Sequence, residues 1–370
     1  MKILMAIKRL EDMAGGAERV FLQVAEGLRN NGHEVSLVTF DRMSASSFYK
    51  MPEGMKWTQS GIGNSARQAG YLETVKRIFK LRRVIKDHAP DLVIPFQHSM
   101  FVPVVLAMSG LHTPIIASEH IVPDHYRTRP LEYLLLVLTG LRCKKITVLS
   151  EAIIKMYPPI LHSRMVAMPN PVETAPHPAV VEGVPYRPKI LLSVGRLDPQ
   201  KDQKTLIEAF AKLHPKFPDW RLKIFGEGAL RKDLEQQISS LGMNDYISLP
   251  GLTDNIMREY EGAQAFALAS TYESFGLATA EAMSAGLPVV GFADCAGTNE
   301  LIRNRESGLL IDIHDGETRA QALARTLSLL LASPELRREL GNRGRDQIST
   351  LSIDNVIKRW KDLIRAVMRS

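Results

Sequence analysis

The sequence has little cysteine and no apolar run long enough to cross a membrane. Its two cysteines, Cys143 and Cys295, lie in apolar surroundings, which gives no disulfide framework and suits a reducing cytoplasm. The longest apolar stretches, residues 101–111 and 133–141, fall short of the roughly 20 residues that a membrane-spanning helix needs. The apolar run at residues 3–7 is brief and ends at charges, so we expect a first strand rather than a signal peptide. These features favour a cytoplasmic protein that does not span a bilayer.

Several catalytic and metal-binding motifs are also missing. The sequence contains no Asp-x-Asp, Cys-x-x-Cys or His-Glu-x-x-His, the spacings in which metal ligands often occur. It has no Gly-x-Ser-x-Gly nucleophile elbow and no Walker A loop. The first glycine-bearing turn, at Gly15 and Gly16, does not follow the dinucleotide pattern G-x-G-x-x-G. We therefore predict no metal and no resident cofactor.

Charge is distributed unevenly along an otherwise ordinary composition. The 370 residues are 45% hydrophobic and 24% charged, which is typical of a soluble globular protein large enough for two domains. The net charge is +7, with 22 Lys+Arg against 15 Asp+Glu in residues 1–175 and 25 against 25 in residues 176–370. The excess positive charge therefore lies in the amino-terminal half. A basic half is compatible with nucleic acid, an anionic membrane surface or an anionic substrate.

The first half alternates short apolar runs with helical patterns. Strands are expected at residues 2–7, 34–39, 91–95, 113–118 and 145–149, with a less certain one near 56–57. Helical patterns lie between them, and the one at 71–86 is strongly basic. Such alternation predicts an α/β fold with a doubly wound parallel sheet in residues 1–175.

The second half repeats this architecture after a proline-rich stretch, residues 176–188, that we interpret as a linker. Strands are expected at 189–195, 221–225, 247–249, 265–268, 288–292 and 309–311, with helices between them. Residues 189–352 thus form a second Rossmann-like domain, and 353–370 a final helix. The prediction is two such domains facing each other across a cleft.

Residues 265–290, AFALASTYESFGLATAEAMSAGLPVV, are the most informative stretch. A buried strand leads into a polar loop and then a helix rich in alanine, which Gly286 and Pro288 end. The backbone N–H groups of Phe275, Gly276 and Leu277 are expected at the carboxyl edge of the sheet. A helix N-terminus there attracts anions, so a phosphorylated ligand is the first hypothesis.

Other polar residues follow expected strand ends. Arg196 and Lys201 could both reach one diphosphate, although two solvated loop cations are the simpler interpretation of such a pair. Gly226 would let a ligand approach the backbone, or simply serve a tight turn. Glu281, among small and apolar neighbours, should need a partner. His120 could be an acid, a base or a hydroxyl-binding group, or be purely structural.

Together these segments resemble glycosyltransferase family 4, whose members are retaining enzymes of GT-B fold. The resemblance rests on GGAER near the start, GRLDPQK, FGEGALR and above all ESFGLATAEAMSAGLPVV, and it covers nearly the whole chain. It implies transfer of a sugar, HexNAc or hexose, from a nucleotide-diphosphate sugar, with a UDP-sugar expected. It also implies that the final helix, 353–370, packs back on the amino-terminal, acceptor-binding domain.

The resemblance assigns roles to individual residues. It implies that Arg196 and Lys201 hold the donor diphosphate, that Glu281 binds the ribose hydroxyls, and that Glu273 binds hydroxyls of the donor sugar. His120 would approach the sugar near C6, so the catalytic residues expected are Glu273, His120, Arg196 and Lys201. The remaining donor-binding residues would be Gly15, Gly16, Gly226, Phe275, Gly276 and Leu277. Because no Asp-x-Asp is present, cations and a helix N-terminus would replace a metal in neutralising the leaving group.

The acceptor is less constrained by the motifs. The basic helix and its surroundings are consistent with docking on anionic lipid headgroups or a polyprenyl diphosphate, through Arg67, Lys76, Arg77, Lys80, Arg82 and Arg83. A solvated basic face is the competing interpretation. The segment around His120, with Asp124, Tyr126 and Arg127, also resembles family members that extend polyprenyl-diphosphate-linked glycans. We therefore expect a peripheral enzyme on the cytoplasmic face of the inner membrane that uses a lipid-linked saccharide.

Three alternatives stay open from the residues alone. The acceptor could be a soluble small molecule or an inositol lipid. The enzyme could be a nucleotide-sugar epimerase of the same fold, although the motif with Glu273 and Glu281 argues against this. A non-enzymatic nucleic-acid-binding protein is the least favoured, and we predict no nucleic-acid partner.

Overall fold

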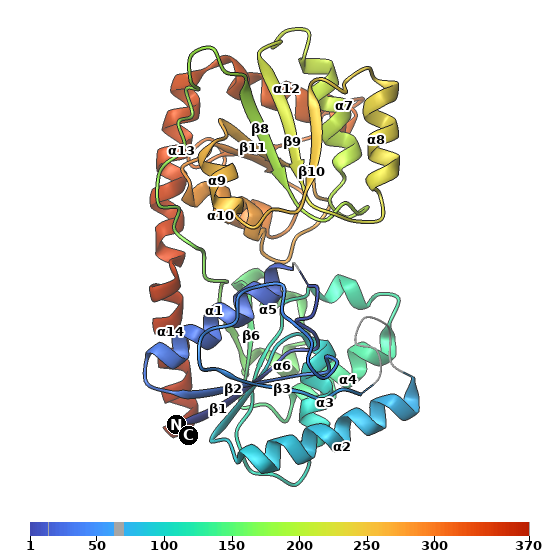
Figure 1. The fold of residues 1–370 in the computed structure, drawn as a ribbon, viewed down its shortest axis with the longest axis vertical. Helices are drawn as coiled ribbons and strands as arrows, with labels where there is room; N and C mark the ends of the chain where they lie inside the picture. The colour runs from blue at the N-terminus through green and yellow to red at the C-terminus, as the bar shows by residue number, and fades with distance from the viewer. Residues whose placement is uncertain (14, 63–69, 370) are drawn as a thin grey trace. The chain divides into compact units, whose positions relative to one another are not determined.

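The computed structural model describes residues 1–13, 15–62 and 70–369, and the chain divides into two compact units. Unit 1 comprises Met1–Pro171 with Ile353–Ser370, and unit 2 comprises Val172–Ser352. Figure 1 shows strands and helices alternating along the chain in both units. Each unit has its own sheet and its own core.

Unit 1 is built on parallel strands. Its strands are β1 (Lys2–Ala6), β2 (Glu34–Thr39), β3 (Lys56–Gln59), β4 (Leu92–Pro95), β5 (Ile116–Ser118), β6 (Lys145–Val148) and β7 (Met165–Ala167). They form a four-stranded sheet in the order β3-β2-β1-β4 and a three-stranded sheet in the order β5-β6-β7. Parallel bridges from Val93 to Ile115 and from Phe96 to Ser118 join β4 to β5. The seven strands therefore lie in one continuous parallel layer.

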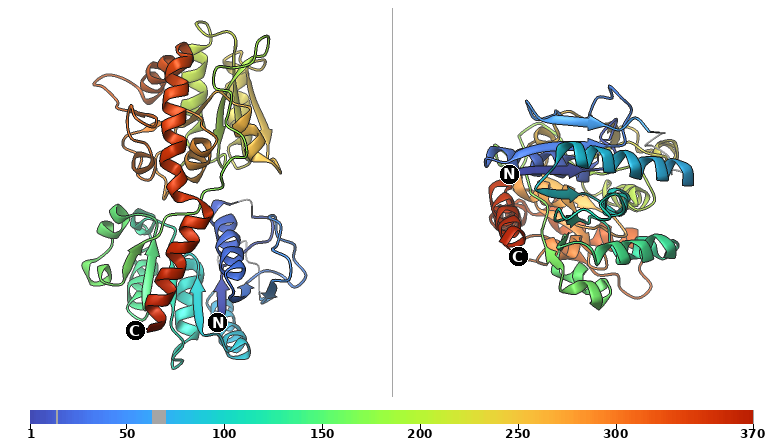
Figure 2. Two further views of the ribbon diagram at one scale, coloured as in Figure 1. Left: turned by 90° about the vertical axis from the view of Figure 1, so that its left-hand side faces the viewer. Right: turned by 90° about the horizontal axis from the view of Figure 1, so that it is seen from below.

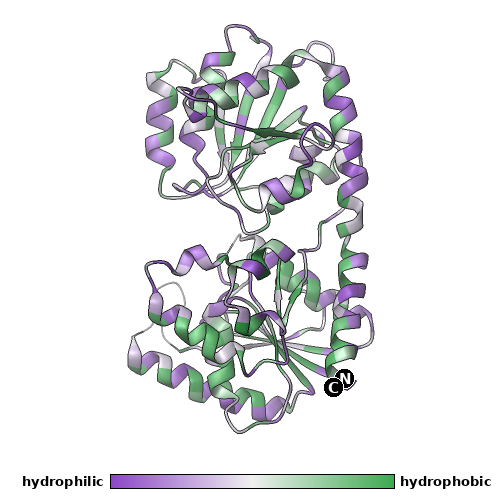
Figure 3. Ribbon diagram, turned by 180° about the vertical axis from the view of Figure 1, so that it is seen from behind, coloured by the Kyte–Doolittle hydropathy of each residue, from purple (hydrophilic) through white to green (hydrophobic). Residues whose placement is uncertain are grey.

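The helices of unit 1 are α1 (Gly16–Asn30), α2 (Tyr71–His88), α3 (His98–Ala107), α4 (Pro130–Gly140), α5 (Glu151–Met156), α6 (Pro159–His162) and α14 (Ile353–Arg369), with a 3-10 turn η1 (Pro123–Tyr126). In β1, residues Ile3 to Ala6 are all buried. A strand covered by helices on both faces has no solvent side, so it shows a continuous apolar run rather than alternation. The strands are accordingly coloured mainly as hydrophobic in Figure 3, whereas the helices alternate.

The final helix, α14, packs against α1 inside unit 1. Val356, Trp360, Ile364 and Val367 recur at helical spacing and are buried, so α14 has one apolar face. Gly27 permits the close approach, because a Cβ atom there would lie 2.5 Å from the side chain of Ile357. Figure 2 shows α14 running along the side of unit 1.

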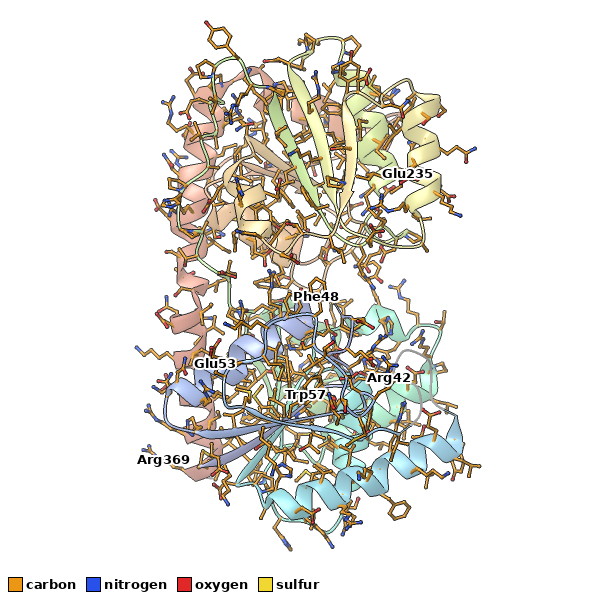
Figure 4. All side chains as sticks on the ribbon, in the orientation of Figure 1. Arg42, Phe48, Glu53, Trp57, Glu235 and Arg369 are labelled. Atoms are coloured by element: carbon orange, nitrogen blue, oxygen red, sulfur yellow. The ribbon has the colours of Figure 1, made fainter. Side chains whose placement is uncertain are left out.

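The strand expected near 56–57 is β3, the edge strand beside β2. Trp57, labelled in Figure 4, donates a hydrogen bond from Nε1 to Thr39 Oγ1 of β2 at 3.0 Å. The two strands therefore share a side-chain contact in addition to their backbone ladder.

Unit 2 contains one six-stranded parallel sheet. Its strands are β8 (Lys189–Val194), β9 (Trp220–Phe225), β10 (Ile247–Gly251), β11 (Ala265–Leu268), β12 (Val289–Phe292) and β13 (Leu309–Ile311). Its helices are α7 (Gln203–Leu213), α8 (Arg231–Ser240), α9 (Ile256–Glu261), α10 (Leu277–Ser284), α11 (Thr298–Leu301), α12 (Arg319–Ala332) and α13 (Pro334–Ile348), with a 3-10 turn η2 (Ser349–Leu351).

The strand order of unit 2, β10-β9-β8-β11-β12-β13, is that of a Rossmann fold. The chain moves outward from β8 in one direction and then returns to β11 to continue in the other. The carboxyl ends of β8 and β11 therefore border the switch point, where open α/β sheets bind ligands.

The segment predicted as a linker packs onto unit 2. Ala179 N donates to Ala285 O at 2.7 Å, and Gln264 Nε2 donates to Val180 O at 3.2 Å. Arg337 is fully buried and donates from Nε to Val181 O at 2.6 Å. Because these contacts fix its backbone, the division between the units falls at residue 171 rather than at 175 or 188.

Candidate functional site

The loops that follow β8 and β11 are joined at the switch point of unit 2. Gln200 O accepts hydrogen bonds from Thr271 N at 2.9 Å and from Thr271 Oγ1 at 3.2 Å. The amide of Gln200 donates in return to Tyr272 O at 2.9 Å. Two loops whose bonded residues are 71 and 72 positions apart in sequence are thus held together. Sequence reasoning did not single out Gln200, since a loop glutamine carries no distinctive signal.

Lys201 and Glu273 form an ion pair across these two loops. Lys201 Nζ lies 2.5 Å from Glu273 Oε1, and the two side chains are 14% and 9% exposed. A carboxylate with so little access to water needs such a partner. The structure therefore brings together two of the residues predicted to be catalytic, at the switch point of the sheet.

Glycines allow neighbouring strand ends to approach. Gly226, after β9, has φ +143°, and a Cβ there would lie 2.0 Å from Gly195 O. Gly297 has φ +77°, and a Cβ there would lie 2.6 Å from Glu273 O. Glu273 is further held because its N–H donates to Ala296 O at 3.1 Å. Gly226 thus serves the packing of the β8 and β9 loops, which is the turn interpretation of this residue.

Helix α10 begins beside this pair. Gly276 is its N-cap residue, with φ +81°, and Leu277 is its first residue. Phe275 is buried and Leu277 half-buried. The first N–H groups of a helix have no partner within the helix, and together with the helix dipole they favour an anion. The backbone N–H groups of residues 275–277, predicted to bind phosphate, therefore lie next to Lys201 and Glu273.

Glu281 has a protein partner. It is 3% exposed, and its Oε2 accepts a hydrogen bond from the hydroxyl of Tyr260 at 3.1 Å. This satisfies the expectation that a glutamate among apolar neighbours needs a partner. Tyr260 lies on α9 and was not identified from the sequence, because it is 21 residues from Glu281 and no local pattern links the two.

Arg196 differs from Lys201 in its exposure. Its side chain is 69% exposed, and Nη2 lies 3.0 Å from Asp198 Oδ2 and 3.3 Å from Gln200 Oε1. A surface ion pair of this kind contributes little to stability. The guanidinium can therefore leave Asp198 at small cost when a more highly charged anion is available.

In unit 1, Gly15 and Gly16 lie at the start of α1, after β1. Gly15 is the N-cap residue and Gly16 the first residue of the helix. A Cβ at Gly15 would lie 2.1 Å from Glu18 Oε2, so the carboxylate of Glu18 covers this turn. A negative charge at a helix N-terminus is favourable, and Glu18 is buried there.

His120 follows β5 and is held by a chain of hydroxyl groups. Thr147 Oγ1 donates to Ser118 Oγ at 2.9 Å, and Ser118 Oγ lies 3.0 Å from His120 Nε2. A neutral imidazole has one N–H group, so Nε2 either accepts from the Ser118 hydroxyl or donates to it. Burial lowers the pKa of His120 to about 4, so the ring is neutral at pH 7.

The second ring nitrogen of His120, Nδ1, is not used by this chain of hydroxyl groups. Within the described part of the chain, Nδ1 has no hydrogen-bond partner although it is buried. The ring stacks on Phe96 with centroids 5.1 Å apart, and Phe96 stacks on Trp360 of α14 at 6.2 Å. The final helix therefore supports the position of His120 through one intervening ring.

Glu119 is a buried carboxyl group beside His120. Its Oε1 accepts from the N–H groups of His120 and Ile121 at 2.9 Å each. Oε2 lies 3.5 Å from the Tyr126 hydroxyl and 4.0 Å from His98 Nδ1. Burial raises the pKa of Glu119 to about 8, although the backbone hydrogen bonds oppose the shift. Burial lowers the pKa of His98 to about 4. At pH 7 the carboxyl group and the imidazole are therefore mainly uncharged.

The predicted basic surface on α2 is only partly exposed. Lys76, Lys80 and Arg83 are exposed, but Arg77 is 4% exposed. Arg77 pairs with Glu73 at 2.6 Å and lies over the ring of Phe40 at 4.8 Å. It is therefore a structural residue and does not offer its charge to a membrane surface.

Arg82 also has a structural contact. Its Nη1 donates to Ala107 O and Ser109 O at 2.7 Å each, which ties α2 to the end of α3. Arg67 lies outside the described residues.

Among the described residues, no group of three or more His, Cys, Asp or Glu side chains could hold a metal ion. Within the same residues, no helix is both long enough and apolar enough to cross a bilayer.

Comparison with known proteins identifies the family. The model for "Glycosyltransferase Family 4" matches residues 14–175, and the model for "Glycosyl transferases group 1" matches residues 180–347. One relative, from Campylobacter jejuni, is the "GalNAc-alpha-(1->4)-GalNAc-alpha-(1->3)-diNAcBac-PP-undecaprenol alpha-1,4-N-acetyl-D-galactosaminyltransferase". It is 27% identical over 369 residues, covering 99% of both chains.

Solved structures share the fold. Sucrose-phosphate synthase from Thermosynechococcus elongatus has a TM-score of 0.86 at 19% identity, covering 100% of this chain and 99% of its own. Anabaena Alr3699/HepE in complex with UDP and glucose has a TM-score of 0.79 at 18% identity, covering 99% and 100%.

These likenesses define the class as two Rossmann-like domains in the GT-B fold, as the sequence predicted. The chain belongs to glycosyltransferase family 4 and is a glycosyltransferase.

Proposed function

We propose that this glycosyltransferase moves a hexose or N-acetylhexosamine from a nucleotide-diphosphate sugar to a hydroxyl group of a lipid-linked saccharide. The donor in this proposal is a UDP-sugar, and the anomeric configuration is retained. Unit 2 would be the donor-binding domain, and unit 1, which has the excess of positive charge, the acceptor-binding domain.

The observation that carries this proposal is the Lys201–Glu273 pair at the switch point of unit 2. The pair lies at the carboxyl ends of β8 and β11, with the N-terminus of α10 following Glu273. A cation and a helix N-terminus suit a diphosphate, whereas a carboxylate suits the hydroxyl groups of a sugar. Groups suited to the diphosphate and to the sugar of such a donor therefore lie side by side.

Each residue of unit 2 then has a distinct role. Lys201 and Arg196 bind the diphosphate, and Arg196 exchanges Asp198 for it. The N–H groups at Phe275, Gly276 and Leu277 complete the phosphate site. Glu273, positioned by Lys201, accepts hydrogen bonds from sugar hydroxyls. Glu281 accepts from the ribose hydroxyls and is positioned by Tyr260.

The chemistry consists of one bond formed and one broken at the anomeric carbon. The acceptor oxygen bonds to that carbon on the face from which the diphosphate leaves, and the acceptor proton passes to a phosphate oxygen. Negative charge grows on the leaving group in the transition state. Lys201 and the α10 N-terminus are fixed donors, and together with Arg196 they stabilise this charge without a metal ion. His120 forms a hydrogen bond with a hydroxyl group of the sugar through Nδ1.

The acceptor is inferred from charge and from the relative. The Campylobacter protein is named for transfer to an undecaprenol-diphosphate-linked saccharide, and it spans the whole chain. The exposed Lys76, Lys80 and Arg83 on α2 provide positive charge near an anionic lipid surface. We place the enzyme at the cytoplasmic face of the inner membrane as a peripheral protein.

The direct test supplies the purified protein with a set of nucleotide sugars and a polyprenyl-diphosphate-linked saccharide. Release of nucleoside diphosphate and NMR of the product identify the donor and the configuration of the new bond. We expect transfer from a UDP-sugar with retention, lost on Lys201→Ala. An inverted product, transfer only from another nucleotide, or full activity of Lys201→Ala would each contradict a part of the proposal.

A further inference from the structure

Helix α4 exposes a stripe of four leucines on its outer side. Leu131, Leu134, Leu135 and Leu138 are 75%, 52%, 44% and 52% exposed. Their spacing of three, four and seven residues places them along one face of the helix. Single exposed leucines are common on soluble proteins, but a contiguous apolar patch marks an interaction site. We call these four residues the α4 stripe.

Positive charges lie at both ends of the α4 stripe. Arg127 and Arg129 precede the helix, and the exposed Arg142 and Lys144 follow it. Arg127 pairs with Asp124 at 3.0 Å, and Arg129 pairs with Glu132, the only charged residue within α4, at 3.6 Å. The excess positive charge therefore lies at the carboxyl end of the helix, at Arg142 and Lys144. An apolar helix face with excess cations at one end matches the boundary between acyl chains and anionic headgroups of a bilayer.

A second copy of this chain fits the α4 stripe poorly. If two copies of α4 packed antiparallel, Arg127 and Arg129 of one would face Arg142 and Lys144 of the other. In a parallel pair, Arg142 and Lys144 of one copy would lie beside the same residues of the other, where like charges repel. Four leucines on one short helix also cover far less than the about 800 Å² per partner of a stable interface.

The neighbouring helices also expose apolar side chains, and α2 exposes basic ones as well. Helix α3 packs against both α2 and α4. Helix α2 exposes Leu72 and Phe79 together with Lys76, Lys80 and Arg83, and α3 exposes Leu106. Apolar and basic side chains are therefore combined on the outer surfaces of helices in one packed group.

We propose that the α4 stripe inserts into the headgroup region of an anionic membrane and is the principal membrane anchor of unit 1. This inference deepens the proposed function and rests on it, because a lipid-linked acceptor requires the enzyme to stay at the bilayer. The leucines supply apolar burial, and Arg142 and Lys144 supply attraction to anionic lipid. The helix lies parallel to the surface, since both of its ends are charged.

The leucines set the size of the expected effect. Each presents about half of its surface or more, and moving that area out of water changes partitioning by about tenfold. Leu134→Glu with Leu138→Glu should therefore lower binding to vesicles by about a hundredfold or more. Leu329, on α12 of unit 2, is also 52% exposed, so Leu329→Glu is a matched control.

The experiment is flotation of the full chain with vesicles of phosphatidylcholine, with and without phosphatidylglycerol. We expect the native protein and Leu329→Glu to bind the anionic vesicles and the double leucine variant to remain unbound. Arg142→Glu with Lys144→Glu should weaken binding to anionic vesicles, because it replaces two attractive charges by two repulsive ones. Equal binding by the native protein and the double leucine variant would refute the proposal.

Two further measurements separate the remaining possibilities. If light scattering shows a dimer that Leu134→Glu with Leu138→Glu dissociates, the occupant is a second copy and the membrane proposal is wrong. Flotation needs neither donor nor acceptor, so its result does not depend on the proposed sugar transfer. Transfer to a short-chain, water-soluble acceptor tests that function separately, and the double leucine variant should retain it.

Discussion

The Lys201–Glu273 pair allows structure and function to be separated by one mutant cycle. Lys201→Met removes the ammonium group and leaves the carboxylate of Glu273, 7% exposed, without that partner. Removing one member of a buried pair costs about 3–5 kcal/mol, and because both side chains keep some exposure we expect about 3 kcal/mol. For a unit the size of residues 172–352, this lowers the melting temperature by about 6–12 °C.

The double variant carries the decisive information. Lys201→Met combined with Glu273→Gln contains no uncompensated charge, so its stability should return towards that of the native protein. The coupling energy between the two positions should be about 2–3 kcal/mol. Transfer should stay low in the double variant, by about 100-fold or more, because the leaving diphosphate has lost a cation that acts in the transition state.

The assay combines thermal unfolding with release of nucleoside diphosphate, measured on the same preparations. Lys189 and Asp219 provide the control cycle, since Lys189 Nζ also lies 2.5 Å from Asp219 Oδ2 but these side chains are 27% and 55% exposed. That cycle should give a coupling of about 0–1 kcal/mol and leave transfer intact. Recovery of both stability and transfer in the double variant would show that the Lys201–Glu273 pair is purely structural.

Other predictions concern residues around the two sites. Glu119 has a raised pKa, so it binds a proton in the folded state that the unfolded chain has released, and stability should fall as pH rises towards 8. Urea titrations between pH 6.5 and 8, above the pKa values of nearby histidines, measure the free energy of unfolding. Over this range it should fall by about 1–2 kcal/mol less in Glu119→Gln than in the native protein. An unchanged slope would count against a buried neutral carboxyl group. Tyr260→Phe should raise the KM for the donor and leave kcat nearly unchanged, because the hydroxyl only positions Glu281; equal KM values in steady-state kinetics would disprove that role. Gly226→Ala should lower the melting temperature, since a Cβ would meet Gly195 O, and no change in a thermal scan would contradict the close approach.

The glycosyltransferase family, the two α/β halves and most of the strands could be predicted from the sequence. Parallel strands with helices on both faces must be apolar throughout, so β1, β8 and β11 appear as short buried runs. The boundaries of the helix within residues 265–290 could also be predicted, because Gly276 and Gly286 flank it and adopt backbone conformations that glycine prefers. The candidate donor residues could be named because they lie in the loops after strands or in the helix that follows, within motifs that resemble those of the family.

The partners of those residues could not be predicted. Lys201 meets Glu273 across 72 positions because the strand order places β8 beside β11. Glu281 meets Tyr260 across 21 positions because α10 packs against α9. The basic helix shows the same limit, since a count of arginines does not reveal that Arg77 turns inward to Glu73 and Phe40.

Local sequence thus determined which residues end strands and begin helices, as steric and hydrophobic preferences act over a few positions. Only the tertiary structure decided which charges are paired, which are buried and which leucines face outward. Pairing and burial depend on contacts between segments far apart in the chain, and no periodicity within one segment records them.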